Sequence, residues 1–395
     1  MNKPKLWTRD FLLVTVVNFL VAVIFYLLMV VISAYAMDHF GSSPGEAGLA
    51  ASIFVIGALI ARLFSGTWME RIGRKRLLFI GLIFGLVMSI AYFGVKSIIP
   101  LLVVRLLHGA TFGIASTLAA AIVSNIIPKE RFGEGIAYFM LSTTLATAIG
   151  PFLAMFMSQH GSFNAIFVAC TVAAALCFVG TLFLSVPEMK FTEQQFEDLK
   201  ELKLSNYLEM KSIPISLVCG LIYLCYSSVL SFFASYAKEI HLVDAASFFF
   251  IIYAVIVLIS RPIIGRLFDS KGDNFIMYPV IPIFMAGMYI LSQAHHGYAL
   301  LLAAVFIGLG SGAVQSSCQA IAIKAAPPHR AGLANATFFM FSDIGMGIGP
   351  VIFGLFIPFI GYRGVYASAA AVAFACVFLY YLVHGKRFVH GTVIE

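Results

Sequence analysis

The first long apolar stretch, residues 11–37, reads FLLVTVVNFLVAVIFYLLMVVISAYAM and carries no charged side chain. A helix of this length can cross a hydrocarbon core of roughly 30 Å. Similar stretches recur along the whole chain, in which 61% of the 395 residues are apolar and only 11% are charged. Soluble domains carry about 25% charged residues, so the composition predicts a protein that crosses a membrane many times.

Twelve stretches are long enough to span. Each should be a helix, because backbone groups in lipid must be hydrogen-bonded within their own segment. A β-barrel would instead show alternating segments of roughly ten residues, which the sequence lacks. The predicted helices are 11–37, 47–69, 77–95, 98–126, 135–158, 163–186, 213–237, 245–267, 275–293, 298–324, 332–358 and 364–384.

The distribution of lysine and arginine predicts the orientation. With the N-terminus inside, only Lys96, Lys238 and Arg363 fall in outer connections, and the other loop cations fall on the cytoplasmic side. Both termini are therefore expected in the cytoplasm. The net charge of +7 then reflects topology and contact with anionic lipid rather than nucleic-acid binding. All six cysteines lie in predicted helices, which indicates packing and neither disulfides nor a metal site.

The two halves of the chain form an internal repeat with a constant offset of 199 residues. Matching pairs include Arg62 with Arg261, Gly73 with Gly272, Gly109 with Gly308, Gly113 with Gly312, Pro128 with Pro327 and Gly150-Pro151 with Gly349-Pro350. The offset preserves helix direction, so the halves are parallel repeats about an axis along the membrane normal. We predict six-helix bundles at 1–186 and 213–395, joined by a charged cytoplasmic linker at 187–212.

The segment after the second predicted helix, residues 66–76, reads GTWMERIGRKR. It resembles the loop signature of the major facilitator superfamily, and GRLFDSKG at 265–272 is a weaker copy. In that family, the acidic residue of this loop contacts a helix of the other half. The contact holds the cytoplasmic side closed in one conformation. The resemblance implies gating roles for Gly66, Glu70, Arg71, Gly73, Arg74, Gly265, Asp269 and Gly272. The alternative is a basic loop that only sets topology.

The fourth predicted helix contains LVVRLLHGATFG at 102–113, which resembles the family's signature in that helix with His108 in place of the usual glutamine. An arginine inside a membrane is costly and marks a functional position by default. In related proton-driven antiporters this arginine is associated with proton coupling, so Arg105 carries that expectation. His108 lies one turn away and titrates near neutral pH when unperturbed, although a packed, hydrogen-bonded histidine is the alternative.

The fifth helix contains the pair Gly150-Pro151, and the eleventh contains Gly349-Pro350. The pairs resemble a signature of the drug/proton antiporter branch, with fewer glycines upstream in the fifth helix than that branch has. They are expected to permit a kink or close packing where the halves rock during gating.

Asp343 is the one acidic residue predicted deep within a helix, roughly 16 Å beyond Gly332. A carboxylate there is expected to exchange a proton or hold a cationic group, and the alternative is a permanent ion pair or packing contact. Many drug/proton antiporters have an acid in the first helix, but here that helix offers Asn18 and Ser33. Asp343 and His108 are therefore the candidate proton carriers.

The fold of this family lines its cavity with helices 1, 4, 7 and 10. The polar and aromatic candidates there, besides Arg105 and His108, are Asn18, Phe25, Tyr26, Tyr223, Tyr226, Gln315 and Gln319. Amide and aromatic groups with a single arginine suit an amphiphilic or anionic organic molecule better than a metal ion. The alternative is that these residues do not bind substrate and instead make structural polar contacts between helices.

These features predict a proton-coupled exporter of small organic molecules, drug-like compounds or metabolites. The proton gradient would be its energy source, without a cofactor, and it would work as a monomer in a bacterial cytoplasmic (inner) membrane. Its partners would be substrate, protons and lipids, with no nucleic acid. A proton-coupled importer is the alternative. A membrane enzyme or a non-transporting receptor is more remote, because the sequence has no nucleophile elbow, phosphate loop or clustered metal ligands.

Overall fold

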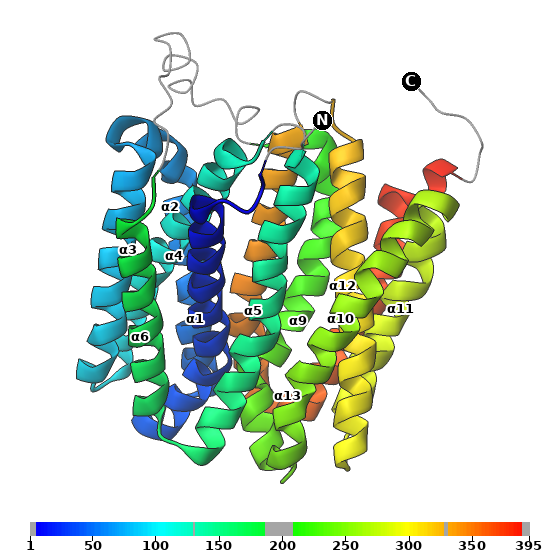
Figure 1. Ribbon diagram of the computed structural model, residues 1–395. Coiled ribbons are helices and arrows are strands. Elements are labelled where there is room, and N and C mark those ends of the chain that lie inside the picture. Colours follow the sequence, from blue (N-terminus) through cyan, green and yellow to red (C-terminus); the bar gives the residue numbers. More distant parts are fainter. Residues whose placement is uncertain (1–4, 129–130, 186–207, 328–330, 389–395) are drawn as a thin grey trace. The chain divides into compact units, whose positions relative to one another are not determined.

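The computed structural model describes residues 5–128, 131–185, 208–327 and 331–388, and every regular element within them is a helix. The first half contains α1 (Arg9–Phe40), α2 (Pro44–Ile72), α3 (Arg74–Ala91), α4 (Ile98–Ile126), α5 (Phe132–His160) and α6 (Phe163–Leu182). The second contains α9 (Ile213–Glu239), α10 (Val243–Lys271), α11 (Asp273–Ser292), α12 (Gly297–Lys324) and α13 (Ala331–Val383) (Figure 1). Eleven of these helices are long and apolar enough to cross a membrane.

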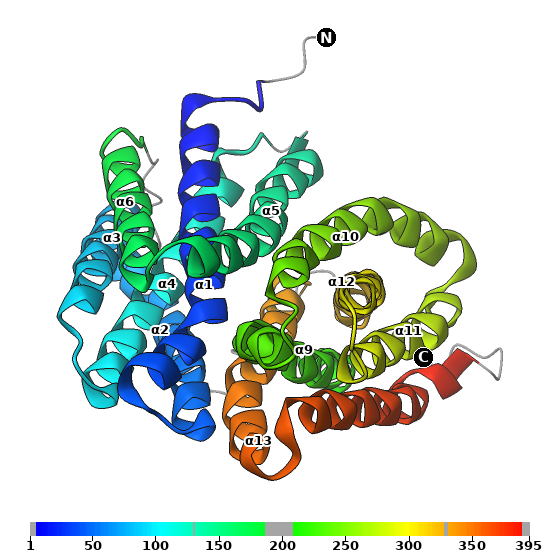
Figure 2. The ribbon, with the colours of Figure 1, turned by 90° about the horizontal axis from the view of Figure 1, so that it is seen from below.

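The last helix, α13, accounts for two of the twelve predicted spans. Its 53 residues would extend about 80 Å if straight, far more than a bilayer requires. The backbone of Gly361 leaves the helical conformation with φ 66° and ψ 176°, and Figure 2 shows the chain changing direction within α13. The expected pair of helices is therefore present, joined at a glycine that tolerates positive φ.

Local sequence explains where several helices begin and end. Thr8 caps α1 by accepting a hydrogen bond from the Phe11 amide at 3.2 Å. Glu46 accepts from the Ser43 amide at 2.8 Å, and the Ser43 hydroxyl accepts from the Glu46 amide, which makes a reciprocal capping box at the start of α2. Gly41, with φ 61°, ends α1 in the left-handed conformation.

The chain folds into two units, Met1–Ser42 with Ile53–Glu201 and Ser43–Ser52 with Leu202–Glu395. In the first unit α1 packs against α4, α5 and α6, while α3 packs against α4 and α6. In the second unit α12 lies within a ring of α9, α10, α11 and α13 (Figure 2). The start of α2 belongs to the second unit because Gly48 lies against the Pro350 carbonyl and Gly354 lies against the Pro44 carbonyl. Most of the predicted linker, residues 186–207, lies outside the described ranges.

Candidate functional site

Close glycine contacts build the helix pair that carries the candidate site, and they repeat in both units. Gly109 and Gly113 of α4 lie against the backbones of Phe54 and Ala58 on α2. In the second unit, Gly308 of α12 lies against the backbone of Tyr253, which is Phe54 shifted by 199 residues, and Gly312 lies against the side chain of Val257, which is Ala58 so shifted. Small residues let the helix axes approach, so the sequence repeat is also a repeat in packing.

Arg105 lies at the centre of a polar cluster inside the first unit. Its side chain is 0% exposed, and its guanidinium carbon lies 4.4 Å from the centre of the Phe54 ring. The Tyr92 hydroxyl, just beyond the end of α3, hydrogen-bonds Arg105 and lies 3.2 Å from His108 Nδ1. Tyr92 also stacks on Phe167 of α6 with ring centres 5.1 Å apart. Phe54 and Tyr92 therefore contact the arginine, Phe167 supports Tyr92, and the guanidinium is held away from lipid.

A small cavity lies beside this cluster. It offers about 30 Å³ and is lined in part by His108, Thr111, Phe54 and Cys177. That is room for one or two water molecules. The Thr111 hydroxyl donates to the His108 carbonyl at 2.7 Å, so the polar side of the cavity belongs to α4.

The three candidates on α1 lie in different surroundings. Asn18 is buried, and its amide donates to the hydroxyls of Ser142 at 2.9 Å and Thr143 at 3.1 Å on α5. Phe25 stacks on Phe112 of α4 at 5.0 Å and so joins the aromatic wall around Arg105. Tyr26 is half-buried beside Phe25, and its Cβ lies where α5 approaches α1 at Gly150.

The second unit brings its candidates into two polar contacts. Tyr226 of α9 stacks on Tyr253 of α10 at 5.3 Å, and the Tyr253 hydroxyl lies 3.2 Å from that of Ser311 on α12. Arg261 donates to Gln315 Oε1 at 3.0 Å. The pair that matches it in the first unit, Arg62 and Ser116, is hydrogen-bonded at 3.3 Å. Arg62 therefore ties α2 to α4, and Arg261 ties α10 to α12.

The remaining cavity candidates also contact neighbouring helices. Tyr223 lies edge-on to Tyr226 with ring centres 6.2 Å apart. Gln319 Nε2 donates to Asn335 Oδ1 on α13 at 2.8 Å. Asn18, Phe25 and Tyr26 thus belong to the first unit, and the four candidates from α9 and α12 belong to the second.

Asp343 lies on α13, on a turn that packs against α9. Ser342 contacts Cys219 of α9, and Gly345 lies against the Gly220 carbonyl. Asp343 itself is half-buried and interacts with neighbouring groups, so it is not an unpartnered carboxylate. It is a membrane-embedded carboxylate beside a close helix contact, which fits either a proton carrier or a packing role.

The gating signatures are more helical than predicted. The segments expected as loops continue α2 to Ile72 and α10 to Lys271, so each turn is reduced to a single glycine. Those glycines, Gly73 with φ 90° and Gly272 with φ 83°, hold matching left-handed positions. The turn therefore needs glycine at both places.

The other gating candidates divide into described and undescribed residues. Arg74 donates to the Ala121 carbonyl at 3.4 Å and so ties the start of α3 to α4. A Cβ on Gly265 would meet nothing within 4 Å among the residues that the structure describes. The surroundings of Gly66 and the side chains of Glu70, Arg71 and Asp269 lie outside what the structure describes.

Both Gly-Pro pairs bring helices together within a unit. A Cβ on Gly150 would lie 3.1 Å from the Val23 carbonyl and 3.2 Å from the Leu27 amide of α1. In the second unit Gly349 contacts Leu224 and Ser227 of α9, which occupies the place of α1 in the repeat. Pro151 and Pro350 both lie inside their helices, so each helix continues through its proline. Close packing is thus the visible role of these pairs.

Sequence reasoning missed Tyr92, Phe54 and Tyr253. Tyr92 could not be found by spacing, because it reaches Arg105 and His108 from the short turn after α3. Phe54 and Tyr253 carried a usable signal, since they are repeat partners that face the repeated glycines of α4 and α12. Among the described residues, no group of three or more His, Cys, Asp or Glu side chains could hold a metal ion.

Two repeated units of membrane-length helices, with a charged cluster buried inside one of them, define a multi-pass membrane transporter. A family model described as Major Facilitator Superfamily matches residues 14–296 and 282–391. The chain belongs to this superfamily. Its members and structural neighbours are transporters, not enzymes.

Relatives and solved structures agree with this assignment. The chain is 26% identical over 357 residues to the multi-drug resistance efflux pump PmrA of Streptococcus pneumoniae, covering 84% of each chain. It is 23% identical over 389 residues to the multidrug resistance protein MdtG of Klebsiella pneumoniae, covering 94% of this chain and 92% of that one. The crystal structure of the nucleoside transporter NupG matches with a TM-score of 0.74 and 15% identity, covering 95% of this chain and 99% of that one.

Proposed function

We propose that this transporter is a proton-coupled exporter of small organic molecules in a bacterial inner membrane, and that it works by alternating access. The observation that carries the proposal is Arg105, a wholly buried cation within a membrane span. Its repeat counterpart is the apolar Ala304, so the fold itself does not require a charge there. Keeping an arginine in such a position is costly, which supports a functional role.

Within this proposal Asp343 carries the proton and His108 does not. His108 and Arg105 share the Phe54 ring and the Tyr92 hydroxyl, so a charged imidazole would place a second positive charge in the same buried cluster. Like charges in a buried site strongly disfavour that state. His108 then acts as a neutral hydrogen-bonding partner of Tyr92, and the carboxylate of Asp343 is left to bind and release the proton.

The substrate class is inferred from the cavity residues predicted from the sequence. Their amide and phenol groups occur among aromatic side chains, which suits drug-like or metabolite molecules with both apolar and polar parts. The names of PmrA and MdtG, both multidrug resistance proteins, support export of such compounds.

Transport in oriented vesicles tests the proposal. A compound that shifts the thermal unfolding of the purified protein would be offered to inverted and to right-side-out vesicles with an imposed proton gradient. An exporter should accumulate it in acid-filled inverted vesicles, and a protonophore should stop accumulation. Accumulation only by right-side-out vesicles with acid outside would establish the importer instead, and accumulation that ignores the gradient would refute proton coupling.

The role of Asp343 is tested in the same vesicles. Asp343→Asn should abolish uphill transport while exchange down the compound's own gradient continues. The matched control is Asp244→Asn, which removes an exposed carboxylate at the start of α10 and should transport like the wild type. Uphill transport by Asp343→Asn would exclude this residue as the proton carrier.

A further inference from the structure

A basic groove lies at the start of α3 and the end of α6 in the first unit. It has a volume of about 380 Å³. The residues that line it are Ile72, Lys75, Arg76, Phe79, Ile80 and Leu182. Ile72, Lys75 and Arg76 belong to the signature at 66–76, and none of the six residues lies in the buried cluster around Arg105. The positive charges mark this end of the helices as the cytoplasmic membrane boundary.

The groove combines two exposed cations with an apolar floor. Lys75 and Arg76 are exposed, and neither makes an ion pair with any residue that the structure describes. Below them, Ile80 is 41% exposed and Leu182 is 50% exposed. Phe79 of α3 packs against Phe178 of α6 at 5.1 Å, which fixes the floor between the two helices.

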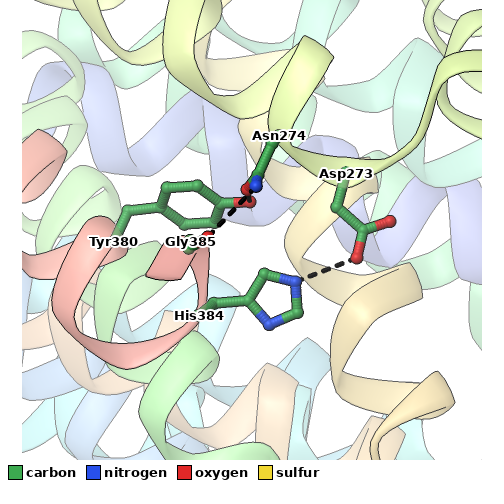
Figure 3. Close-up of polar contacts among 5 residues, drawn as sticks. All are labelled: Asp273, Asn274, Tyr380, His384 and Gly385. Atoms are coloured by element: carbon green, nitrogen blue, oxygen red, sulfur yellow. Dashed lines mark hydrogen bonds and ion pairs between the residues drawn. The ribbon is translucent and has the colours of Figure 1, made fainter. Parts of the chain in front are cut away.

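The repeat shows what an equivalent place looks like when the chain fills it. Lys75 matches Asn274, whose amide donates to the Gly385 carbonyl at 3.2 Å and accepts from the Tyr380 hydroxyl at 2.7 Å. Beside it, His384 Nε2 lies 2.9 Å from Asp273 Oδ2, a hydrogen bond that becomes an ion pair when the imidazole is protonated (Figure 3). We call these five residues the polar latch. It joins the start of α11 to the end of α13, as Figure 3 shows.

The first unit has no such latch in its described part. Arg74 and Ser185 stand where the second unit has Asp273 and His384, and the Ser185 amide donates to Asp10 of α1 at 2.9 Å instead. The end of α6 is therefore tied to α1, while α3 and α6 pack together through Phe79 and Phe178. Beside that contact, the groove formed by the described residues carries two positive charges.

We propose that this groove binds one anionic phospholipid of the cytoplasmic leaflet. The phosphate would lie at Lys75 and Arg76, and an acyl chain would lie along Ile80 and Leu182. The apolar floor continues on α3 through Phe84, which is 56% exposed, so the lipid tail stays on the membrane-facing surface. A free phosphate or a soluble metabolite would leave that floor uncovered, which favours the lipid. This site does not depend on the direction or coupling of transport.

Native mass spectrometry of the detergent-purified full chain tests the site. Phosphatidylglycerol and phosphatidylcholine would be titrated separately, and we expect one tightly held phosphatidylglycerol per protein and weaker phosphatidylcholine. In the double variant Lys75→Gln/Arg76→Gln, phosphatidylglycerol binding should weaken roughly thirtyfold, since each cation contributes about 1 kcal/mol. The matched control is Lys211→Gln/Lys386→Gln, which removes two exposed cations of the second unit and should bind like the wild type.

Other results would overturn the proposal. Equal loss of binding in both double variants would show a general charge effect. The same thermal stabilisation by inorganic phosphate as by phosphatidylglycerol would identify a soluble-anion site. Lipid-free protein whose dimer fraction falls only in Lys75→Gln/Arg76→Gln would identify a second copy of the chain as the occupant. Unchanged unfolding temperatures without lipid check that both variants fold.

Discussion

The cytoplasmic ends of α3 and α6 differ sharply from those of α11 and α13, although the repeat makes them equivalent. In the second unit Asn274, Tyr380 and the Asp273–His384 pair close the gap with the chain's own polar groups. In the first unit Lys75 and Arg76 stand over an open groove. Where two halves have the same backbone fold, side chains that differ between them show where one half has taken on a separate task.

The same contrast appears in the membrane interior. The helix contacts at Gly109 and Gly308 correspond, and so do the hydrogen bonds made by Arg62 and Arg261. Yet Arg105, His108 and Tyr92 correspond to Ala304, Ile307 and Leu291, which are all apolar. Matched residues therefore build the bundles, and the unmatched polar cluster is the candidate for function.

The largest effect expected is on transport, from Arg105→Lys. A lysine keeps the charge but loses the planar group that spans the Phe54 ring and Tyr92. Loss of a charge-assisted hydrogen bond of about 1.5–3 kcal/mol should slow uphill transport roughly tenfold to hundredfold. Initial rates in inverted vesicles measure this. Ala304→Ser at the matching position should stay within about twofold, because a serine hydroxyl inside a helix can bond to the carbonyl one turn back. A wild-type rate in Arg105→Lys would reduce Arg105 to a point charge.

Alanine at the repeated glycines should break the shared packing to different degrees. A Cβ at position 109 would collide with the Phe54 carbonyl, whereas at position 308 it would lie 2.8 Å from the Tyr253 carbonyl. Overpacking of this kind costs about 1–3 kcal/mol, and we expect Gly109→Ala at the upper end and Gly308→Ala at the lower. Thermal unfolding in detergent gives the order. The reverse order would mean that the α10–α12 contact is the more rigid one.

The sequence predicts a feature well when the residues that form it lie close together in the chain or are related by the repeat. The twelve spans, the pairing of Gly73 with Gly272 and the arginine within a span all follow from hydropathy and the repeat. The sequence predicts that the second helix ends at residue 69, with a loop at the signature that follows, whereas α2 continues to Ile72. Tyr92, the groove at Lys75 and the polar latch depend on segments far apart in sequence, and no spacing rule reports such contacts.

Removing the Asn274 side chain should lower stability more than removing Lys75 at the matching position of the first unit. Asn274→Ala deletes the hydrogen bonds to Tyr380 and Gly385, each worth about 0.5–1.5 kcal/mol, so stability should fall by about 1–2 kcal/mol. Lys75→Ala, at the matching position in the first unit, removes an exposed side chain and should change stability by no more than about 0.5 kcal/mol. Unfolding in detergent without added lipid measures both. Equal losses would show that the two ends are not built differently.

The smallest effect expected is the coupling between Asp273 and His384. Their side chains are only 13% and 15% exposed and share one hydrogen bond at 2.9 Å, so a coupling of about 0.5–1.5 kcal/mol is expected. A double-mutant cycle with Asp273→Asn and His384→Gln isolates this energy, because each single variant removes the same pair. The same cycle on Arg74 and Ser185 should give no coupling, since Arg74 bonds to α4 and Ser185 bonds to α1. Coupling of similar size in both cycles would mean that the first unit ties α3 to α6 as well, and that its groove is not left open for a lipid.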